Sequence, residues 1–367
     1  MFNIFNWLKA AIALILFVIS FMGSAKDRQL YIYNWSSYIA PDTLTNFEKE
    51  TGIKVVYDVF DSNEVLEGKL MAGNTGFDLV VPSDSFLDRQ ARVGIFAPLD
   101  KSKLPNYHNL DENLLAMLAK HDPDNRYAIP YMWLTTGIGY NVDKVKKILG
   151  EDAPVDSWDL VLNPDNLKKL SRCGVAFLDA PTEIFPTVLN YLGLDPNSQN
   201  PEDYKVATEH LSKLRPFVTY FHSSKFINDL ANGDICVAIG WSGDIMQSIQ
   251  AAKDANNGVN VKYYIPKEGA IAYFDVFAIP KDAENIDEAY AFLNYLMEPQ
   301  VIASISNYVF YANAVKNSQP YLDERIKNDP AIYPSAETMN KLFSLQVMPP
   351  KIDKLMTRSW TKVLTDR

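Results

Sequence analysis

Eight side chains of two chemical kinds stand in short segments that the pattern places at strand ends and in loops. Five are aromatic and three are carboxylates: Trp35, Tyr38, Trp241, Tyr273 and Tyr311, with Glu183, Asp244 and Asp275. An ammonium group that leaves water needs carboxylates or oriented dipoles as partners. Aromatic rings contact methylenes and attract cations. Rings around a methylene chain with acids at its ends are complementary to an aliphatic diamine, so the pattern indicates a site for a small cation.

Two of these motifs are more specific than an isolated residue, because each couples an aromatic ring to an acid. They are the segments 241–244 (WSGD) and 273–275 (YFD). A lone tryptophan is more often a core residue, and a lone loop aspartate is more often a cap or turn residue. Asp275 differs because it lies in a strand-like run, 271–279, where an unpaired charge is costly. It therefore predicts a partner cation.

Signatures of catalysis are missing from the sequence. The four histidines show no paired metal-ligand spacing, and neither a G-x-S-x-G elbow nor a P-loop occurs. We therefore expect a protein that is not an enzyme and that needs no metal and no cofactor. The alternative from another class, a secreted hydrolase or lyase acting on amines, would need a nucleophile–base pair or a metal set.

The N-terminus has the pattern of a secretory leader. Lys9 precedes an apolar run, 10–22, that is too short to span a bilayer, and the small residues 23–25 follow. We expect cleavage after Ala25 and an exported mature protein; the alternative is an uncleaved anchor. The net charge of −10 argues against nucleic acid as a partner and mildly favours a cationic one.

The chain has two cysteines, Cys173 and Cys236. In an oxidising compartment an even number makes one disulfide the default interpretation, and two buried free thiols are the alternative.

The mature chain begins with alternating strands and helices. We expect strands over 30–33, 54–60 and 77–81, with helices from Pro41 to Gly52, from an N-cap at Asp61 to Gly73, and from Phe86 onward. This order predicts an α/β fold with a mostly parallel sheet covered on both faces. Ligands of such sheets bind beyond the carboxyl ends of the strands, where the segments 35–38 and 83–85 fall.

A second α/β region begins after residues 131–136. Residues 137–140 read as a strand, a further strand ends over 277–280, and 286–297 is an amphipathic helix. Composition marks no domain boundary, as expected when the chain crosses between lobes more than once.

At these motifs the chain resembles the periplasmic polyamine-binding proteins of ABC importers. The matching segments are 33–36 (YNWS), 49–57 (KETGIKVVY), 78–83 (DLVVPS), 240–241 (GW), 309–313 (VFYAN) and 357–362 (TRSWTK). The similarity runs almost without a gap from about Leu30 to Lys362.

The resemblance implies the two-lobed type II fold of periplasmic substrate-binding proteins, with the ligand cleft between the lobes. One α/β lobe would comprise residues 26–134 and about 258–313. The other would comprise about 135–257 and 314–367. The family also pairs its two cysteines, which implies a disulfide between Cys173 and Cys236.

The resemblance also implies a set of ligand-binding positions. Carried over residue by residue, these are Trp35, Ser36, Tyr38, Ser83, Glu183, Trp241, Asp244, Tyr273, Asp275 and Tyr311. Asp244 and Asp275 would hold ammonium groups, the rings would contact methylenes, and Glu183 would add more distant negative charge.

Three positions depart from the family's pattern. Ser37 stands where a putrescine-binding member carries aspartate, and Asp84, beside Ser85, stands where that member has a small residue. Tyr273 replaces a phenylalanine. We include Ser37, Asp84 and Ser85 among the site residues, with Asp84 as a possible replacement for the missing acid.

The resulting expectation is a monomeric periplasmic receptor that binds a polyamine, putrescine first, and delivers it to an ABC permease of the inner membrane. Alternatives within the same architecture are a receptor for agmatine, spermidine or another organic cation, such as a basic amino acid, and a polyamine sensor subunit. Preference among putrescine, agmatine, cadaverine and spermidine stays open.

Overall fold

The structure is a computed structural model, and it describes residues 28–365, the side chain of residue 336 excepted. The expected leader and its cleavage site after Ala25 lie outside the described residues. Within 28–365, no helix is long and apolar enough to cross a membrane.

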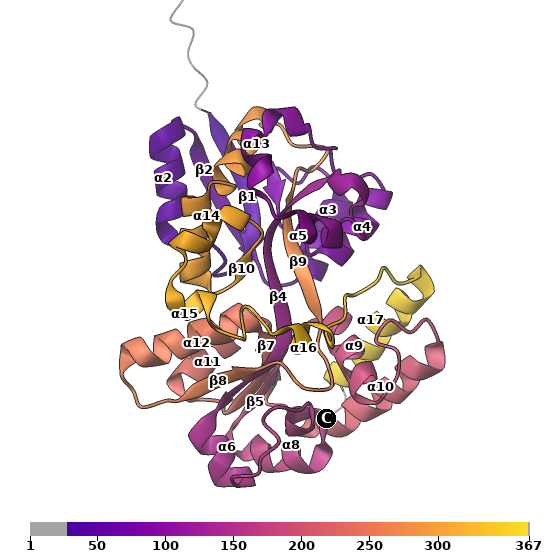
Figure 1. Ribbon diagram of the computed structural model, residues 1–367. Coiled ribbons are helices and arrows are strands. Elements are labelled where there is room, and N and C mark those ends of the chain that lie inside the picture. The colour runs from indigo at the N-terminus through magenta and orange to yellow at the C-terminus, as the bar shows by residue number, and fades with distance from the viewer. Residues whose placement is uncertain (1–27, 366–367) are drawn as a thin grey trace, which may run out of the picture.

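One mixed sheet of ten strands is at the centre of the fold (Figure 1). The strands are β1 (Gln29–Trp35), β2 (Lys54–Phe60), β3 (Leu79–Val80), β4 (Ala128–Asn141), β5 (Val175–Phe177), β6 (Tyr220–Phe221), β7 (Val237–Trp241), β8 (Val261–Tyr264), β9 (Ala272–Ala278) and β10 (Ala312–Asn313). Their spatial order is β2-β1-β3-β9-β4-β7-β5-β6, and β8 and β10 pair with β4.

Helices cover this sheet on both halves of the molecule (Figure 1). They are α2 (Pro41–Thr51), α3 (Asn63–Ala72), α4 (Asp84–Arg92), α5 (Glu112–Leu118), α6 (Val142–Leu149), α7 (Asp159–Leu162), α8 (Pro164–Leu170), α9 (Pro181–Tyr191), α10 (Pro201–Leu214), α11 (Phe226–Asn232), α12 (Ser242–Ala255), α13 (Ile286–Leu296), α14 (Pro299–Val309), α15 (Glu324–Lys327), α16 (Ala336–Met339) and α17 (Pro350–Thr365). Short 3-10 helices occupy Lys101–Lys103, Pro105–Asn109, Pro123–Asn125, Ser171–Cys173, Arg215–Phe217 and Lys316–Tyr321.

The long strand β4 belongs to both halves of the sheet. Up to Thr135 it pairs with β9, and from Thr136 onward it pairs with β7. In Figure 1 it runs between an upper body, which holds β1, β2 and α13, and a lower body, which holds β5, β8 and α6. The change of partner occurs between two adjacent residues, so β4 is a direct connection between the two bodies.

The expected alternation at the start of the chain is confirmed, but the sheet is less parallel than predicted. β1 pairs in parallel with β2 and β3, and β5 pairs in parallel with β6 and β7. The central pairs are antiparallel: β3 with β9, β9 with β4, and β4 with β7. The prediction of a mostly parallel sheet was wrong because β9 and β4 run between the bodies in opposite directions.

Local signals located the early helices with small errors at their starts. α2 ends at Gly52 and α3 ends at Gly73, as expected. The N-cap of α3 is Ser62, whose Oγ accepts a hydrogen bond from the Val65 N–H at 3.3 Å, and not Asp61. The Asp61 carboxylate instead accepts a hydrogen bond from the Ser36 hydroxyl. α4 begins at Asp84, two residues before the predicted Phe86.

Aromatic rings join the helices to the sheet in the core. In the upper body, Phe47 of α2 packs edge-on against Phe292 of α13, with ring centroids 5.0 Å apart. Phe292 also contacts Phe277 of β9. In the lower body, Phe185 of α9 packs against Trp360 of α17. Each body therefore has its own aromatic cluster, and the C-terminal helix is anchored in the lower one.

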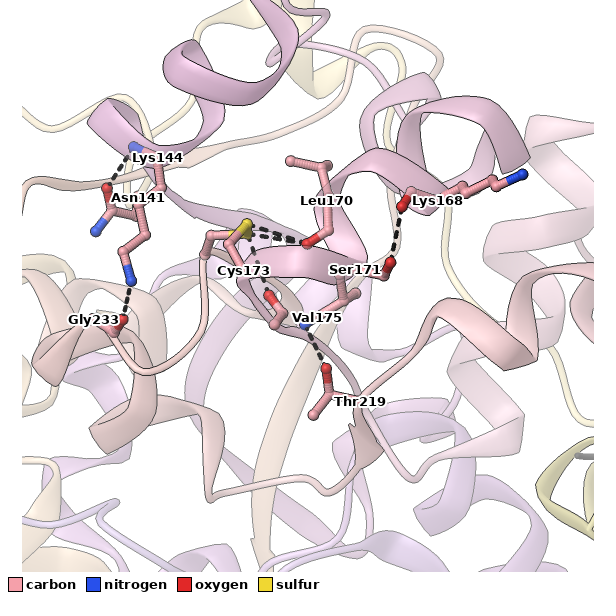
Figure 2. The surroundings of a disulfide bond; sticks show 11 residues. Asn141, Lys144, Lys168, Leu170, Ser171, Cys173, Val175, Thr219 and Gly233 are labelled. Carbon is pink, nitrogen blue, oxygen red and sulfur yellow. Dashed lines mark hydrogen bonds between the residues drawn. A yellow bond between two sulfur atoms is a disulfide. The ribbon is translucent and has the colours of Figure 1, made fainter.

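A disulfide joins Cys173 and Cys236, as predicted, and no cysteine of the described chain is free (Figure 2). Their Cα atoms are 5.5 Å apart, and the closed loop spans 63 positions. The bond lies just before the parallel neighbours β5 and β7, where Val175 is in register with Val237. It therefore fixes the start of both strands.

Replacing both cysteines with serine should lower the free energy of unfolding by about 2–4 kcal/mol, because closing a loop of this length restricts the unfolded chain. Urea unfolding of the two proteins measures the difference. Ligand affinity should be unchanged, because neither cysteine borders the pocket described below. Equal unfolding midpoints with equal slopes would contradict this role.

Candidate ligand-binding site

One pocket lies where the carboxyl ends of strands from both bodies meet. It is lined by Trp35, Ser36, Tyr38, Phe60, Asp61, Leu134, Ser223, Ser224, Trp241, Asp244, Tyr273, Asp275 and Tyr311. β1 and β2 end at this pocket from the upper body, and β6 and β7 end at it from the lower body. This is the edge of the sheet at which the sequence placed a ligand.

The structure brings together most of the predicted site residues, but not all of them. Those that line the pocket are Trp35, Ser36, Tyr38, Trp241, Asp244, Tyr273, Asp275 and Tyr311. Those that do not line it are Ser37, Ser83, Asp84, Ser85 and Glu183. Ser83 and Glu183 nevertheless bond directly to side chains in the pocket wall.

Asp275 of β9 is held by two hydroxyl groups. The Tyr38 hydroxyl donates to its Oδ2 at 2.8 Å, and the Ser83 hydroxyl donates to its Oδ1 at 2.6 Å. Asn63 fixes Ser83 in turn, through bonds to its Oγ and its backbone N–H. Burial raises the pKa of Asp275 to about 7, and the hydroxyl donors oppose this shift only in part. Burial therefore disfavours its charged form.

Asp244 lies in the first turn of α12, immediately after β7. The Tyr311 hydroxyl donates to its Oδ1 at 2.8 Å and accepts from its backbone N–H at 3.1 Å. Burial raises the pKa of Asp244 to about 7, and the nearby charge of Asp61 adds to the shift. Asp244 thus resembles Asp275: a buried carboxylate oriented by a tyrosine.

Glu183 lies in the first turn of α9, behind the rings that line the pocket. The Thr136 hydroxyl donates to its Oε2 at 2.6 Å, and the Trp241 indole N–H donates to both carboxylate oxygens at 3.0 and 3.1 Å. The Tyr273 hydroxyl donates at 3.4 Å. Burial raises the pKa of Glu183 to about 7. This carboxylate therefore fixes two aromatic side chains and adds negative charge behind them.

Three predicted acids share one local arrangement. Asp84, Glu183 and Asp244 each stand in the first turn of a helix that follows a strand: α4 after β3, α9 after β5 and α12 after β7. A helix N-terminus stabilises negative charge. This strand–turn–helix connection places acids that are distant in the sequence at the carboxyl ends of strands of the same sheet.

Aromatic side chains form the walls between the acids. The rings of Trp35 and Trp241 contact edge to face at a centroid distance of 5.4 Å, and those of Tyr38 and Tyr311 do so at 4.9 Å. The Trp35 indole N–H donates to the Val81 carbonyl at 2.8 Å, which fixes that ring. The walls thus offer apolar surface and π faces, the complement of methylenes and cations.

No basic side chain of the described residues neutralises the acids in and behind this pocket. Asp244, Asp275 and Glu183 take part in none of the ion pairs found over residues 28–365. All three are at most 5% exposed. Buried carboxylates without a partner are costly, so a site that retains them is suited to a cation supplied from solution.

Asp84 does not line this pocket, although its charge adds to the raised pKa of Asp275. Its carboxylate accepts hydrogen bonds from the backbone N–H groups of Ser85 at 2.7 Å and Phe274 at 3.1 Å. It borders a separate cavity together with His121 and Trp133. A direct contact between Asp84 and the ligand stays a prediction, and the observed bonds give its carboxylate a role in fixing β9.

Ser37 and Ser85 also lie outside the pocket. Ser37 has a left-handed backbone conformation with φ of 56°, and its carbonyl accepts from the Gln247 side-chain amide at 3.4 Å. Ser85 borders a neighbouring groove with Arg89. Their ligand contacts stay predictions.

Contacts near the pocket join the two bodies of the molecule. The Thr182 hydroxyl of α9 donates to Glu64 of α3 at 2.8 Å. Arg89 of α4 pairs with Glu67 of α3 and, at 3.3 Å, with Asp353 of α17. The upper helices α3 and α4 are therefore bonded to the lower helices α9 and α17.

Gly243 is required for the close approach of Tyr311 to Asp244. A Cβ atom at Gly243 would lie 2.3 Å from the Tyr311 ring, in a part of the wall that is fully packed. Gly243→Ala should displace the ring, break its bonds to Asp244 and weaken ligand binding by roughly tenfold or more.

Gly68→Ala is the matched control, because Gly68 lies in a helix with open space around its Cβ position. Calorimetric titration of both variants with the ligand of the wild type measures the effect. Equal affinities for the two variants would show that Tyr311 does not depend on this glycine.

Comparison with known proteins agrees with this geometry. Residues 42–334 match the family described as bacterial extracellular solute-binding protein. The chain belongs to this family. Within it, the chain is 66% identical over 361 residues to the putrescine-binding periplasmic protein PotF of Escherichia coli, covering 98% of this chain and 97% of that protein. It is 58% identical to the putrescine-binding periplasmic protein SpuD of Pseudomonas aeruginosa, covering 93% of each.

Solved structures of solute-binding proteins have the same architecture. A putative spermidine/putrescine ABC transporter protein from Listeria monocytogenes superimposes with a TM-score of 0.83 at 32% identity, covering 93% of this chain and 100% of that one. The expected α/β fold of the type II periplasmic solute-binding proteins is thereby confirmed.

Five residues of the pocket wall were absent from the sequence prediction: Phe60, Asp61, Leu134, Ser223 and Ser224. Phe60 and Leu134 have the pattern of ordinary strand residues, and no local pattern distinguishes the two serines. Asp61 could have been found, because it directly follows β2 as Ser36 directly follows β1. The interpretation as a helix cap concealed this signal.

Proposed function

We propose that this protein is an extracytoplasmic receptor that binds a polyamine, putrescine first, and delivers it to an ABC permease without chemical change. The observation that carries the proposal is the pair Asp244 and Asp275: two buried carboxylates in one aromatic-walled pocket, without a basic partner among residues 28–365. The printed names of the relatives PotF and SpuD support putrescine as the ligand to test first.

In the proposed complex, the two ends of the diamine are held by different parts of the chain. Asp275, with Tyr38, takes one ammonium group, and Asp244, with Tyr311, takes the other. The indoles of Trp35 and Trp241 cover the methylenes, and each buried methylene adds about 0.8 kcal/mol to the free energy of binding. Ser83 and Glu183 act through the groups they bond. Cation–π attraction adds about 0.5–2 kcal/mol.

The proposed movement is closure of two lobes over the ligand. The first lobe comprises residues 26–134 and about 258–313, and the second comprises about 135–257 and 314–367. The change of partner along β4 between Thr135 and Thr136 supports a boundary there. A ligand that contacts both lobes favours the closed state by its differential affinity.

The proposed location is the periplasm, after removal of residues 1–25, with a monomer docking on an inner-membrane permease. The names of the relatives and the leader pattern support this location. The protein would carry no catalytic group. Agmatine, spermidine or another organic cation is the alternative ligand, and a polyamine sensor subunit is the alternative role.

Calorimetric titration of ligand-stripped protein with putrescine, agmatine, cadaverine, spermidine and arginine tests the proposal. One-to-one binding of at least one polyamine, with arginine far weaker, is the expected result. Tight binding of arginine alone would favour a receptor for basic amino acids. Heat from turnover rather than saturable binding would favour an enzyme. Binding of none of the five would overturn the proposal.

A further inference from the structure

A third carboxylate lines the pocket near its rim. Asp61 follows β2, whose last residue, Phe60, is in register with Trp35 of β1. The Ser36 hydroxyl donates to the Asp61 Oδ1 at 2.7 Å, and the Ser36 N–H donates to the Phe60 carbonyl at 3.0 Å. Asp61 is therefore oriented by the adjacent strand end, although its side chain is only half-buried.

The charge of Asp61 is unpaired within the described residues, and it acts on Asp244. No ion pair among residues 28–365 includes it. Its charge contributes to the raised pKa of Asp244, beside which it lines the same pocket. Asp61 thus extends the acidic character of the pocket beyond Asp244.

The lower body supplies an unused polar group to the same pocket. Ser223 follows β6 and is 4% exposed. Its hydroxyl is buried and has no hydrogen-bond partner in the described chain, while the side chain lines the pocket. A buried hydroxyl without a partner is unfavourable, so this group is available to a ligand atom.

We propose that Asp61, oriented by Ser36, and the Ser223 hydroxyl form an outer subsite for a third nitrogen of a longer polyamine. The inference rests on the proposed function, because it adds a position to the same pocket. A diamine leaves Asp61 uncompensated when its two ammonium groups meet Asp244 and Asp275. A triamine that continues past Asp244 places a further ammonium group where it donates hydrogen bonds to the Asp61 carboxylate and to the Ser223 hydroxyl oxygen.

The test compares a triamine with a diamine on the same variants. Asp61→Asn should weaken spermidine binding about tenfold more than it weakens putrescine binding, because only the triamine places an ammonium group at Asp61. Ser223→Ala should weaken spermidine binding by about fivefold, the value of one hydrogen bond. Asp58→Asn is the control for charge, because Asp58 is exposed on β2 and lies outside the pocket.

The outcomes separate this inference from the proposed function. If Asp61→Asn lowers the affinities for spermidine and putrescine equally, the Asp61 carboxylate acts only through the electrostatic field of the whole protein. An equal loss of spermidine affinity in Asp58→Asn would show the same. Wild-type protein that binds putrescine but not spermidine would overturn the outer subsite and leave the receptor intact. Wild-type protein that binds neither would overturn the proposed function itself.

Discussion

Asp275→Asn is expected to weaken putrescine binding by roughly a hundredfold or more. The substitution leaves one ammonium group of the ligand in a buried site without its counter-charge, and such losses are worth about 3–5 kcal/mol. Titration calorimetry of the variant and the wild type measures the change. The same argument applies to Asp244, which is buried to a similar degree and also accepts a hydrogen bond from a tyrosine hydroxyl.

The unliganded Asp275→Asn protein should be at least as stable as the wild type. The side chain that it replaces is buried and carries a charge that the folded protein disfavours. An asparagine can still bond the hydroxyls of Tyr38 and Ser83, because a hydroxyl donates or accepts. Asp58→Asn serves as the control on the surface. A variant that is stable and binds putrescine within about threefold of the wild type would place the ammonium site elsewhere.

The affinity for a diamine should fall by more than about tenfold between pH 7.5 and pH 5.5. In the unliganded protein, burial raises the pKa of Asp244, Asp275 and Glu183 to about 7, so these groups take up protons below neutral pH. A bound ammonium group favours the ionised acids. Binding at low pH must therefore release protons, and calorimetry in two buffers with different ionisation enthalpies counts them.

The stability of the unliganded protein should change with pH in the opposite direction to the ligand affinity. A carboxyl group whose pKa is higher in the folded chain than in the unfolded chain binds protons more strongly when folded. The contribution of such a group to the free energy of unfolding is favourable at acidic pH and is lost as the pH rises through about 7. Thermal unfolding at pH 5.5 and 7.5, with and without putrescine, shows both effects: the ligand should stabilise more at pH 7.5. An affinity independent of pH would contradict the unpaired, buried state of these acids.

Local signals were sufficient for the early elements and for most of the pocket. Alternating strands and helices with glycine stops located β1, α2 and β2, because each of these signals lies within a few residues of the element it ends. Trp241 and Asp244 were predicted because an aromatic and an acid occur together at a strand end. The same logic of strand ends explains why residues far apart in the sequence line one pocket.

Non-local pairing limited the rest of the prediction. No local pattern shows that β4 pairs with β9 on one side and with β7 on the other, so the antiparallel centre of the sheet was missed. Asp84, like Asp244, lies in the first turn of a helix that follows a strand. Its carboxylate, however, accepts a hydrogen bond from the backbone N–H of Phe274, which is distant in sequence. Asp61 was interpreted as a helix cap because its actual partner, Ser36, directly follows another strand, β1, and is distant in sequence.

A crystal structure of the protein with putrescine tests the central claim most directly. One terminal nitrogen should lie about 2.7–3.2 Å from a carboxylate oxygen of Asp275 and the other at a similar distance from Asp244. The methylenes should lie against Trp35 and Trp241. A ligand whose nitrogens contact neither carboxylate, or that occupies the cavity beside Asp84, would contradict the account.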